Sequence, residues 1–285
     1  MSRNKDRVGG TKRRDTSPPP QVTQPADGGG FAFVVPTEFV ELPSGGRFYA
    51  DGHPLHGVES IEIRQMTAKE EDILTSRTLL KKGVALDRVI KNIIVDGRVD
   101  PDSLLVGDRN AIIVSMRVSG YGNDYTTKVA CPACLVTQDY GFDLNEANIY
   151  EGGNFEELDI TDNEDGTFDV TVPASELNIT FRLLTGHDEK NLLNGITSDR
   201  KRKVDERGIT RQLRNILVAI NGSDDSDMLD YASNNLPSRD SRHLRLAYRL
   251  VAPNVDLTQN FVCEECGEEQ DMEVPLSADF FWPDR

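Results

Sequence analysis

The chain has 285 residues, enough for one large domain or two modest ones, and its formal net charge is −16, from 48 Asp and Glu against 32 Lys and Arg. Such an acidic chain repels phosphate, so the charge argues against direct binding of nucleic acid. Apolar runs of about 20 residues, the length of a membrane-spanning helix, do not occur, and residues 1–10 lack the apolar core of a signal peptide, so the sequence predicts a cytosolic product with no membrane span.

The composition of the chain changes near residue 30, from a basic, polar segment to one rich in aromatic and β-branched residues. Residues 1–30 carry six Lys or Arg, three Asp, a PPP run and a GGG run, and this composition predicts a disordered basic arm. The arm either becomes ordered on a partner or is a solubilising tail. In residues 31–57, aromatic and β-branched residues flank the turn sequence PSGG, which predicts an N-terminal β-hairpin.

The next elements are predicted from local patterns. VESIEIRQ alternates as a β-strand does, and Thr67 with Glu70 three residues later forms a capping-box pattern at the start of a helix. A second helix is predicted over ALDRVIKNIIVDG, ending at Gly97, and a third over DRNAIIVSMRVSG, ending at Gly120.

An acidic linker hairpin is predicted at residues 151–177, with Asp165 and Gly166 suited to a tight turn between two short strands. A calcium-binding loop does not fit these residues, because Thr161 and Val172 occupy positions where the loop needs carboxylates.

Two stretches of the chain resemble each other. Residues 108–144 align without a gap on residues 240–276, at an offset of 132, and nine of the 37 positions are identical. Ordinary residue usage gives about two identities over this length. Upstream, residues 61–74 match residues 179–192 at an offset of 118, and a third match between these two has an offset of 123. This pattern predicts a tandem duplication.

The fold class that follows is α+β, with two copies related by a pseudo-two-fold axis. Each copy is predicted to contain a strand, three helices and a strand pair that bears Cys-x-x-Cys at its bend, over residues 58–150 and 178–285. The offset grows only at residues 198–208 and 221–232, which are therefore predicted to be inserted loops.

The cysteines of the two copies predict one metal site. Cys131 and Cys134 align with Cys263 and Cys266, and the chain has no other cysteine. Two cysteines are half of a tetrahedral site, so the two zinc knuckles are expected to share one structural Zn²⁺ with four thiolate ligands. An iron–sulfur cluster is the weaker alternative, because nothing else indicates electron transfer. A redox Cys-x-x-Cys motif opens a helix, whereas these two lie between strands.

No catalytic residue is predicted. His53 and His56 have a spacing that can hold a metal, but they lie in a polar turn without a third ligand, so a solvated turn is favoured. His187 and His243 lie on separate helical segments, and PSGG lacks the Lys and the Ser or Thr of a nucleotide-binding loop.

Several segments together resemble a known family. ELPSGGRFYADG, IEIRQMTAKEEDIL, a helix ending in IIVDG, and LPSRDSRHLRLAYRLVAPNVDLTQNFVCEECG are similar to the baseplate hub proteins of T-even-type bacteriophages with contractile tails. The resemblance covers about residues 33–281. It implies a non-enzymatic structural or assembly protein whose partners are other tail and baseplate proteins. It also implies assembly in the host cytoplasm and, if the chain is incorporated, a place in the virion baseplate as part of an oligomer. Some members of that family lack the cysteines.

Two other interpretations stay open at this point. A zinc-ribbon adaptor protein in transcription or another host-directed complex needs a basic face, which the acidic composition opposes. A metal-dependent hydrolase needs a zinc ion with an open position for water.

Overall fold

The structure is a computed structural model, and it describes residues 34–205, 207–275 and 278–281. The chain divides into two units, Met1–Pro36 and Thr37–Arg285, each described by itself. Of the first unit only residues 34–36 are described, and they form no helix or strand. The arm predicted at residues 1–30 therefore lies outside the described residues.

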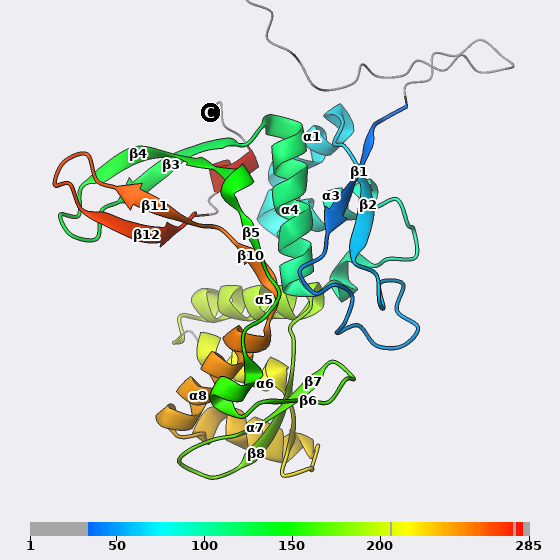
Figure 1. Cartoon of the computed structure of the whole chain (residues 1–285), viewed down its shortest axis with the longest axis vertical. Helices are drawn as coiled ribbons and strands as arrows, with labels where there is room; N and C mark the ends of the chain where they lie inside the picture. The colour runs from blue at the N-terminus through cyan, green and yellow to red at the C-terminus, as the bar shows by residue number, and fades with distance from the viewer. Residues whose placement is uncertain (1–33, 206, 276–277, 282–285) are drawn as a thin grey trace, which may run out of the picture. The chain divides into compact units, whose positions relative to one another are not determined.

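The second unit has a mixed α+β fold, as the sequence predicts, with α-helices and small antiparallel sheets (Figure 1). Its first part contains, in chain order, β1 (Thr37–Glu41), β2 (Ser60–Arg64), α1 (Ala68–Thr75), α2 (Arg77–Lys82), α3 (Ala85–Ile93), α4 (Val106–Tyr121), β3 (Asp124–Ala130), β4 (Thr137–Asp143) and β5 (Asn148–Tyr150). The remainder contains β6 (Thr161–Asp162), β7 (Thr167–Thr171), β8 (Asn178–Arg182), α5 (Gly186–Arg202), α6 (Gly208–Ile216), β9 (Leu217–Ile220), α7 (Ser226–Asn235), α8 (Ser238–Val251), β10 (Asn254–Asp256), β11 (Thr258–Val262) and β12 (Glu269–Glu273).

Five small antiparallel sheets organise these strands. β6, β7, β8 and β9 form a four-stranded sheet in that order, and the other pairs are β1 with β2, β3 with β4, β5 with β10, and β11 with β12. β6 and β7 pair around residues 163–166, as the Asp165-Gly166 turn predicts. β5 and β10 join segments about a hundred residues apart, so the two parts of the unit share a sheet.

The hairpin predicted at residues 31–57 is wrong in its second strand. β1 pairs with β2, with Val40 opposite Ile61, and residues 42–59 form an irregular connection. The reason is a buried carboxylate in the first turn of α4. Asp108 accepts hydrogen bonds from the backbone N–H and hydroxyl of Ser44, at 2.9 and 2.6 Å, and from the hydroxyl of Tyr49 at 2.7 Å. These bonds hold the PSGGRFY segment against α4 and keep it out of a strand ladder.

A second buried aspartate acts in the same way on the other part of the unit. Asp240, in the first turn of α8, accepts hydrogen bonds from the backbone N–H of Ala174 and from the backbone N–H and hydroxyl of Ser175, at 2.7 to 2.9 Å. These bonds hold the connection between β7 and β8 against the start of α8. Asp108 and Asp240 are one of the identical pairs in the sequence alignment.

The helices differ from the prediction in number and in their ends. Ser76 has an extended conformation and separates α1 from α2, so the first part has four α-helices rather than three. α3 ends at Ile93 rather than near Gly97, because Ile94 is extended and bridges to Ile63 of β2. α4 continues past Gly120 to Tyr121 and is followed by the C-cap residue Gly122, which has a φ of 83°.

The two predicted loop insertions are largely helical. Residues 198–202 are the last turn of α5, and residues 226–232 belong to α7. The side chain of Asp225 caps α7 by accepting a hydrogen bond from the backbone N–H of Met228 at 2.9 Å. These two stretches are therefore partly helix rather than loop.

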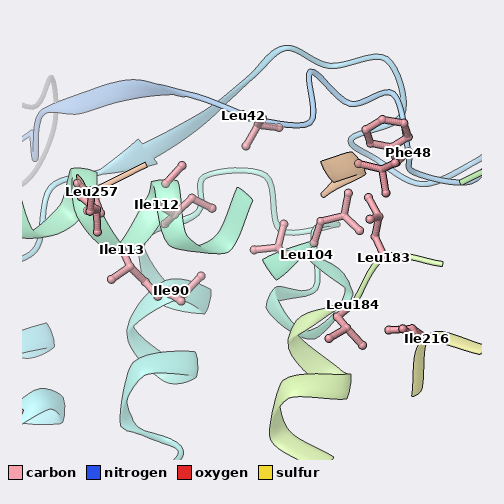
Figure 2. Close-up of a cluster of buried hydrophobic side chains, with 14 of the residues drawn as sticks. Leu42, Phe48, Ile90, Leu104, Ile112, Ile113, Leu183, Leu184, Ile216 and Leu257 are labelled. Carbon is pink, nitrogen blue, oxygen red and sulfur yellow. The ribbon is translucent and has the colours of Figure 1, made fainter. Parts of the chain in front are cut away.

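One hydrophobic core runs through both parts of the unit. Figure 2 shows Ile90, Leu104 and Ile112 of the first part together with Leu183 and Leu184 of the second part, all buried. The two parts also bond through their backbones there: Val106 N donates to Leu184 O and Gly186 N to Leu104 O, at 3.0 and 2.8 Å. No helix in the described ranges is long and apolar enough to cross a membrane.

Gly107 allows the closest approach between the two parts. A Cβ atom at this position in α4 would lie 1.9 Å from the carbonyl oxygen of Pro253, at the entry to β10. Only glycine can bring two backbones this near without displacing one of them.

The capping box at Thr67 and Glu70 is confirmed, and it is coupled to β2. The buried carboxylate of Glu70 accepts hydrogen bonds from the hydroxyl of Thr67 at 2.7 Å and from the guanidinium of Arg64 at 2.7 and 3.0 Å. Burial by itself raises the pKa of Glu70, but the bonds from Arg64 and Thr67 outweigh it and lower the pKa to about 2.

Glu70→Gln is therefore expected to lower the free energy of unfolding by about 2–3 kcal/mol at pH 7. A carboxyl with a lowered folded pKa stabilises the fold above its ordinary value of 4.5, and this contribution is lost as the pH falls toward 2. The difference between the wild type and the variant should thus shrink between these two pH values in urea unfolding. Asp72→Asn, on the exposed side of α1, is the control. A difference that stays constant with pH would contradict this account.

Candidate metal centre

Each Cys-x-x-Cys pair lies at the bend of a two-stranded hairpin. In the β3–β4 hairpin, Cys131 N donates to Val136 O and Leu135 N donates to Cys131 O, both at 2.9 Å. In the β11–β12 hairpin, Cys263 N donates to Glu268 O at 2.8 Å and Gly267 N donates to Cys263 O at 3.0 Å. These bonds tighten both bends and turn the two sulfurs of each pair to one side.

The structure brings all four predicted cysteines together. Their four sulfur atoms lie within 4.8 Å of one another, although the two pairs are more than 120 residues apart in sequence. Sγ of Cys131 lies 3.7 Å from Sγ of Cys266, and Sγ of Cys134 lies 3.7 Å from Sγ of Cys263. A tetrahedral ion with metal–sulfur bonds of about 2.3 Å holds its sulfurs about 3.8 Å apart. The two distances of 3.7 Å match this spacing, and the grouping of all four sulfurs within 4.8 Å is compatible with a metal site.

The surroundings shift the pKa of individual thiols in the cluster in opposite directions. The backbone N–H of Cys134, helped by that of Ala133, lowers the pKa of Cys131 to about 7. The backbone N–H of Glu268 acts in the same direction on Cys266, but burial and the three neighbouring sulfurs outweigh it and raise the pKa of Cys266 to about 12. The thiolate of Cys131 thus forms readily, whereas the neighbouring sulfurs raise the pKa of Cys134 and Cys266 and oppose a second negative charge there, an effect that a bound cation reverses.

The β3–β4 and β11–β12 hairpins lie side by side (Figure 1), and side chains of their strands form hydrogen bonds between them. Gln138 donates to Val262 O at 3.4 Å and accepts from Glu264 N at 3.1 Å. The hydroxyl of Tyr140 donates to Asn260 O at 3.0 Å. Gln138 was identical to its counterpart in the sequence alignment, but its role across the hairpins was missed because it depends on how they cross.

Closer to the helices, Gln259 makes two more bonds between the hairpins. Its amide accepts a hydrogen bond from the backbone N–H of Asp143 at 3.1 Å and donates one to the carbonyl oxygen of the same residue at 2.7 Å. The sulfur cluster is thus the outer end of a bonded seam between the two hairpins.

A charged network forms a further connection between the two parts. Arg109 of α4 is 7% exposed and bonds the carboxylates of Asp87, at 2.8 Å, and of Glu189 in α5. Lys190 of α5 binds Asp87 at 2.9 Å and also binds Asp102. The network was missed because its members are far apart in the sequence and no local pattern marks them.

The histidines do not form a second site. Nδ1 of His53 accepts a hydrogen bond from Leu55 N at 3.2 Å, so Nε2 carries the proton and donates to the hydroxyl of Ser103 at 2.9 Å. His53 is stacked on Tyr49 and half-buried rather than solvated, and burial lowers its pKa. His56 is exposed and bonds the carbonyl oxygen of Tyr49.

His187 is exposed on α5 and His243 is half-buried on α8. Within the described ranges, the four cysteines are the one group of His, Cys, Asp or Glu that is placed to hold a metal ion.

Residues 35–170 match the family described as T4 bacteriophage base plate protein. The match begins just before β1, includes α4 and the first cysteine pair, and ends within β7. Searches of curated proteins and of solved structures gave no significant match. Over residues 35–170, the chain is therefore similar to the family of T4-type phage baseplate proteins.

Proposed function

We propose that this protein is a non-enzymatic structural or assembly component of the baseplate hub of a contractile phage tail. The observation that carries the proposal is the family match over residues 35–170. A baseplate role implies association with other tail proteins and a location in the virion tail if the chain is incorporated. In this role the two parts of the unit offer similar faces to neighbouring subunits.

We further propose that Cys131, Cys134, Cys263 and Cys266 bind one structural Zn²⁺. The spacing of about 3.7 Å between sulfurs of the two hairpins supports this, and thiolates are the ligands that zinc takes in closed structural sites. Four sulfur ligands leave no coordination position for a substrate or a reactive water, which favours a structural role over hydrolysis.

The ion would join two copies of one ancestral unit. The strand pairs β1–β2 and β7–β8 support this, because each is extended by one backbone hydrogen bond just beyond the end of its ladder. Leu42 N donates to Glu59 O after β1, and Val172 N donates to Leu177 O after β7. The bidentate pair of Arg64 with Glu70 is matched by that of Arg182 with Asp188, and the β3–β4 register is matched by β11–β12 at an offset of 132. These correspondences extend the proposed copies at their N-terminal ends to β1 and β7, before the limits that the sequence alignment predicted.

The hub role is tested with phage that lack this chain, complemented with the wild-type gene on a plasmid. Without the chain, we expect host cells to yield few complete baseplates in electron micrographs, and complementation should restore them. Quantitative mass spectrometry of purified particles then separates a subunit, present at a fixed copy number, from an assembly factor, absent from particles. Normal baseplates without the chain would contradict the proposal. Salt-sensitive retention on heparin would instead support the adaptor alternative.

A further inference from the structure

The tip of the first knuckle exposes a continuous apolar loop. Pro132, Ala133, Leu135 and Val136 are all exposed, and Leu135 and Val136 are 77% and 41% exposed. Large apolar side chains that crowd at one projecting point of a soluble protein mark an interaction site more often than scattered ones do.

Leu135 also has an unfavourable backbone conformation. Its φ is 63°, in the left-handed region that disfavours residues with a Cβ. Gly267 occupies the corresponding place in the second knuckle, with a φ of 71° and the same hydrogen bond to the first cysteine of its pair. The bend therefore forms with glycine, and neither burial nor the turn itself requires leucine at position 135.

The adjacent loop carries charge of one sign. Glu264, Glu265, Glu268 and Glu269 are exposed around the second pair of cysteines, and neither loop, residues 131–136 or 263–269, contains a Lys or Arg. Because the sulfurs of the two pairs meet, these glutamates lie beside the apolar loop. The charge excludes anionic lipid and nucleic acid as partners and favours a surface rich in Lys and Arg.

We propose that this tip is a docking surface for another baseplate protein, whose matching face is an apolar pocket with a basic rim. The proposal rests on the proposed baseplate role. Leu135 is the anchor that enters the pocket, Val136 extends the apolar contact, and the glutamates pair with the rim. Because the turn forms with glycine at the matching position, we assign the presence of an exposed leucine in this conformation to binding rather than to folding.

The decisive variant is Leu135→Gly, because folding and docking should respond in opposite directions. Glycine relieves the left-handed strain, so the Tm should not fall and is expected to rise by about 1–2 °C, with metal content unchanged. Docking loses its anchor, so complementation of phage lacking this chain should give a titre at least about tenfold below wild type. Leu135→Met, which keeps an apolar side chain of similar volume, should restore the titre.

Glu176→Gly is the matched control. Glu176 is exposed, has a φ of 56°, and donates its N–H to a carbonyl oxygen four residues earlier, as Leu135 does, but it lies in the β7–β8 connection. This variant should match Leu135→Gly in Tm and the wild type in titre. Val136→Thr provides a second probe of the surface if Leu135→Gly lowers the Tm, and it too should lower the titre.

The outcomes distinguish this proposal from the proposed function. If the wild-type gene restores baseplates and Leu135→Gly and Val136→Thr restore them equally well, the docking surface is refuted while the hub role stands. If the wild-type gene has no effect on baseplates, the hub role itself fails. Replacing Glu265 and Glu268 by Gln should lower the titre as well, and an unchanged titre would refute the basic rim.

Discussion

A Cys266→Ser substitution is expected to release the proposed Zn²⁺ and lower the Tm of the protein by about 10 °C, although Cys266 is exposed. The same loss is expected for Cys131→Ser, at a fully buried position, because each change removes one of four ligands from the same ion. If packing alone stabilised the knuckles, the buried position would be far more sensitive than the exposed one. Equal effects therefore indicate a shared site.

The measurement is metal per monomer by elemental analysis, with hydrogen exchange to locate the loosened segments. Exchange should rise in both hairpins whichever cysteine is replaced, and a chelator should reproduce the pattern in the wild type. Ala133→Ser adds a hydroxyl to the same loop without removing a thiolate and serves as the control. Metal-free wild-type monomers, or hydrogen exchange that rises only in the mutated hairpin, would refute a metal site shared by the two hairpins.

Arg109→Met is expected to lower the free energy of unfolding by about 3 kcal/mol. Methionine fills much of the same volume but leaves the partly buried carboxylate of Asp87 with only Lys190, and leaves Glu189 without its arginine. Removing one partner of a buried ion pair is costly because the remaining charge stays desolvated. Hydrogen exchange should rise at the start of α5 and in α3, where the network joins the two parts.

Arg98→Met is the matched control for this prediction. Arg98 also forms a close ion pair, with Asp96 at 2.7 Å, but its side chain is 78% exposed. Exposed ion pairs contribute little to stability, so this variant should unfold as the wild type does. Equal destabilisation by the two substitutions would show that the interface between the parts does not depend on the buried network.

Local signals in the sequence predicted local structure well. Thr67 and Glu70 marked the start of α1, and the two cysteine pairs marked both hairpin bends, because each signal lies within a few residues of the feature that it forms. The convergence of the four sulfurs was also predictable, since half a tetrahedral site needs another half.

Features that depend on distant residues were not predictable in this way. β1 pairs with β2 because Asp108 holds the intervening segment, and α3 ends early because Ile94 joins β2. Sequence identity was also an incomplete guide to role. Arg117 is fully buried and donates to carbonyl oxygens at the end of α4, whereas its aligned partner Arg249 is exposed.

The meeting of the two cysteine pairs has a consequence for the order of events during synthesis. Cys134 and Cys263 are 129 residues apart, so the first hairpin leaves the ribosome long before its partner sulfurs exist. At about 5–20 residues per second, a ribosome needs about 6–26 seconds to make the intervening chain. During that interval the first thiol pair can supply only half of the four ligands of the proposed zinc site, and the site can be completed only when the second hairpin emerges. Completion of the proposed site therefore requires that every element between the two hairpins has been translated.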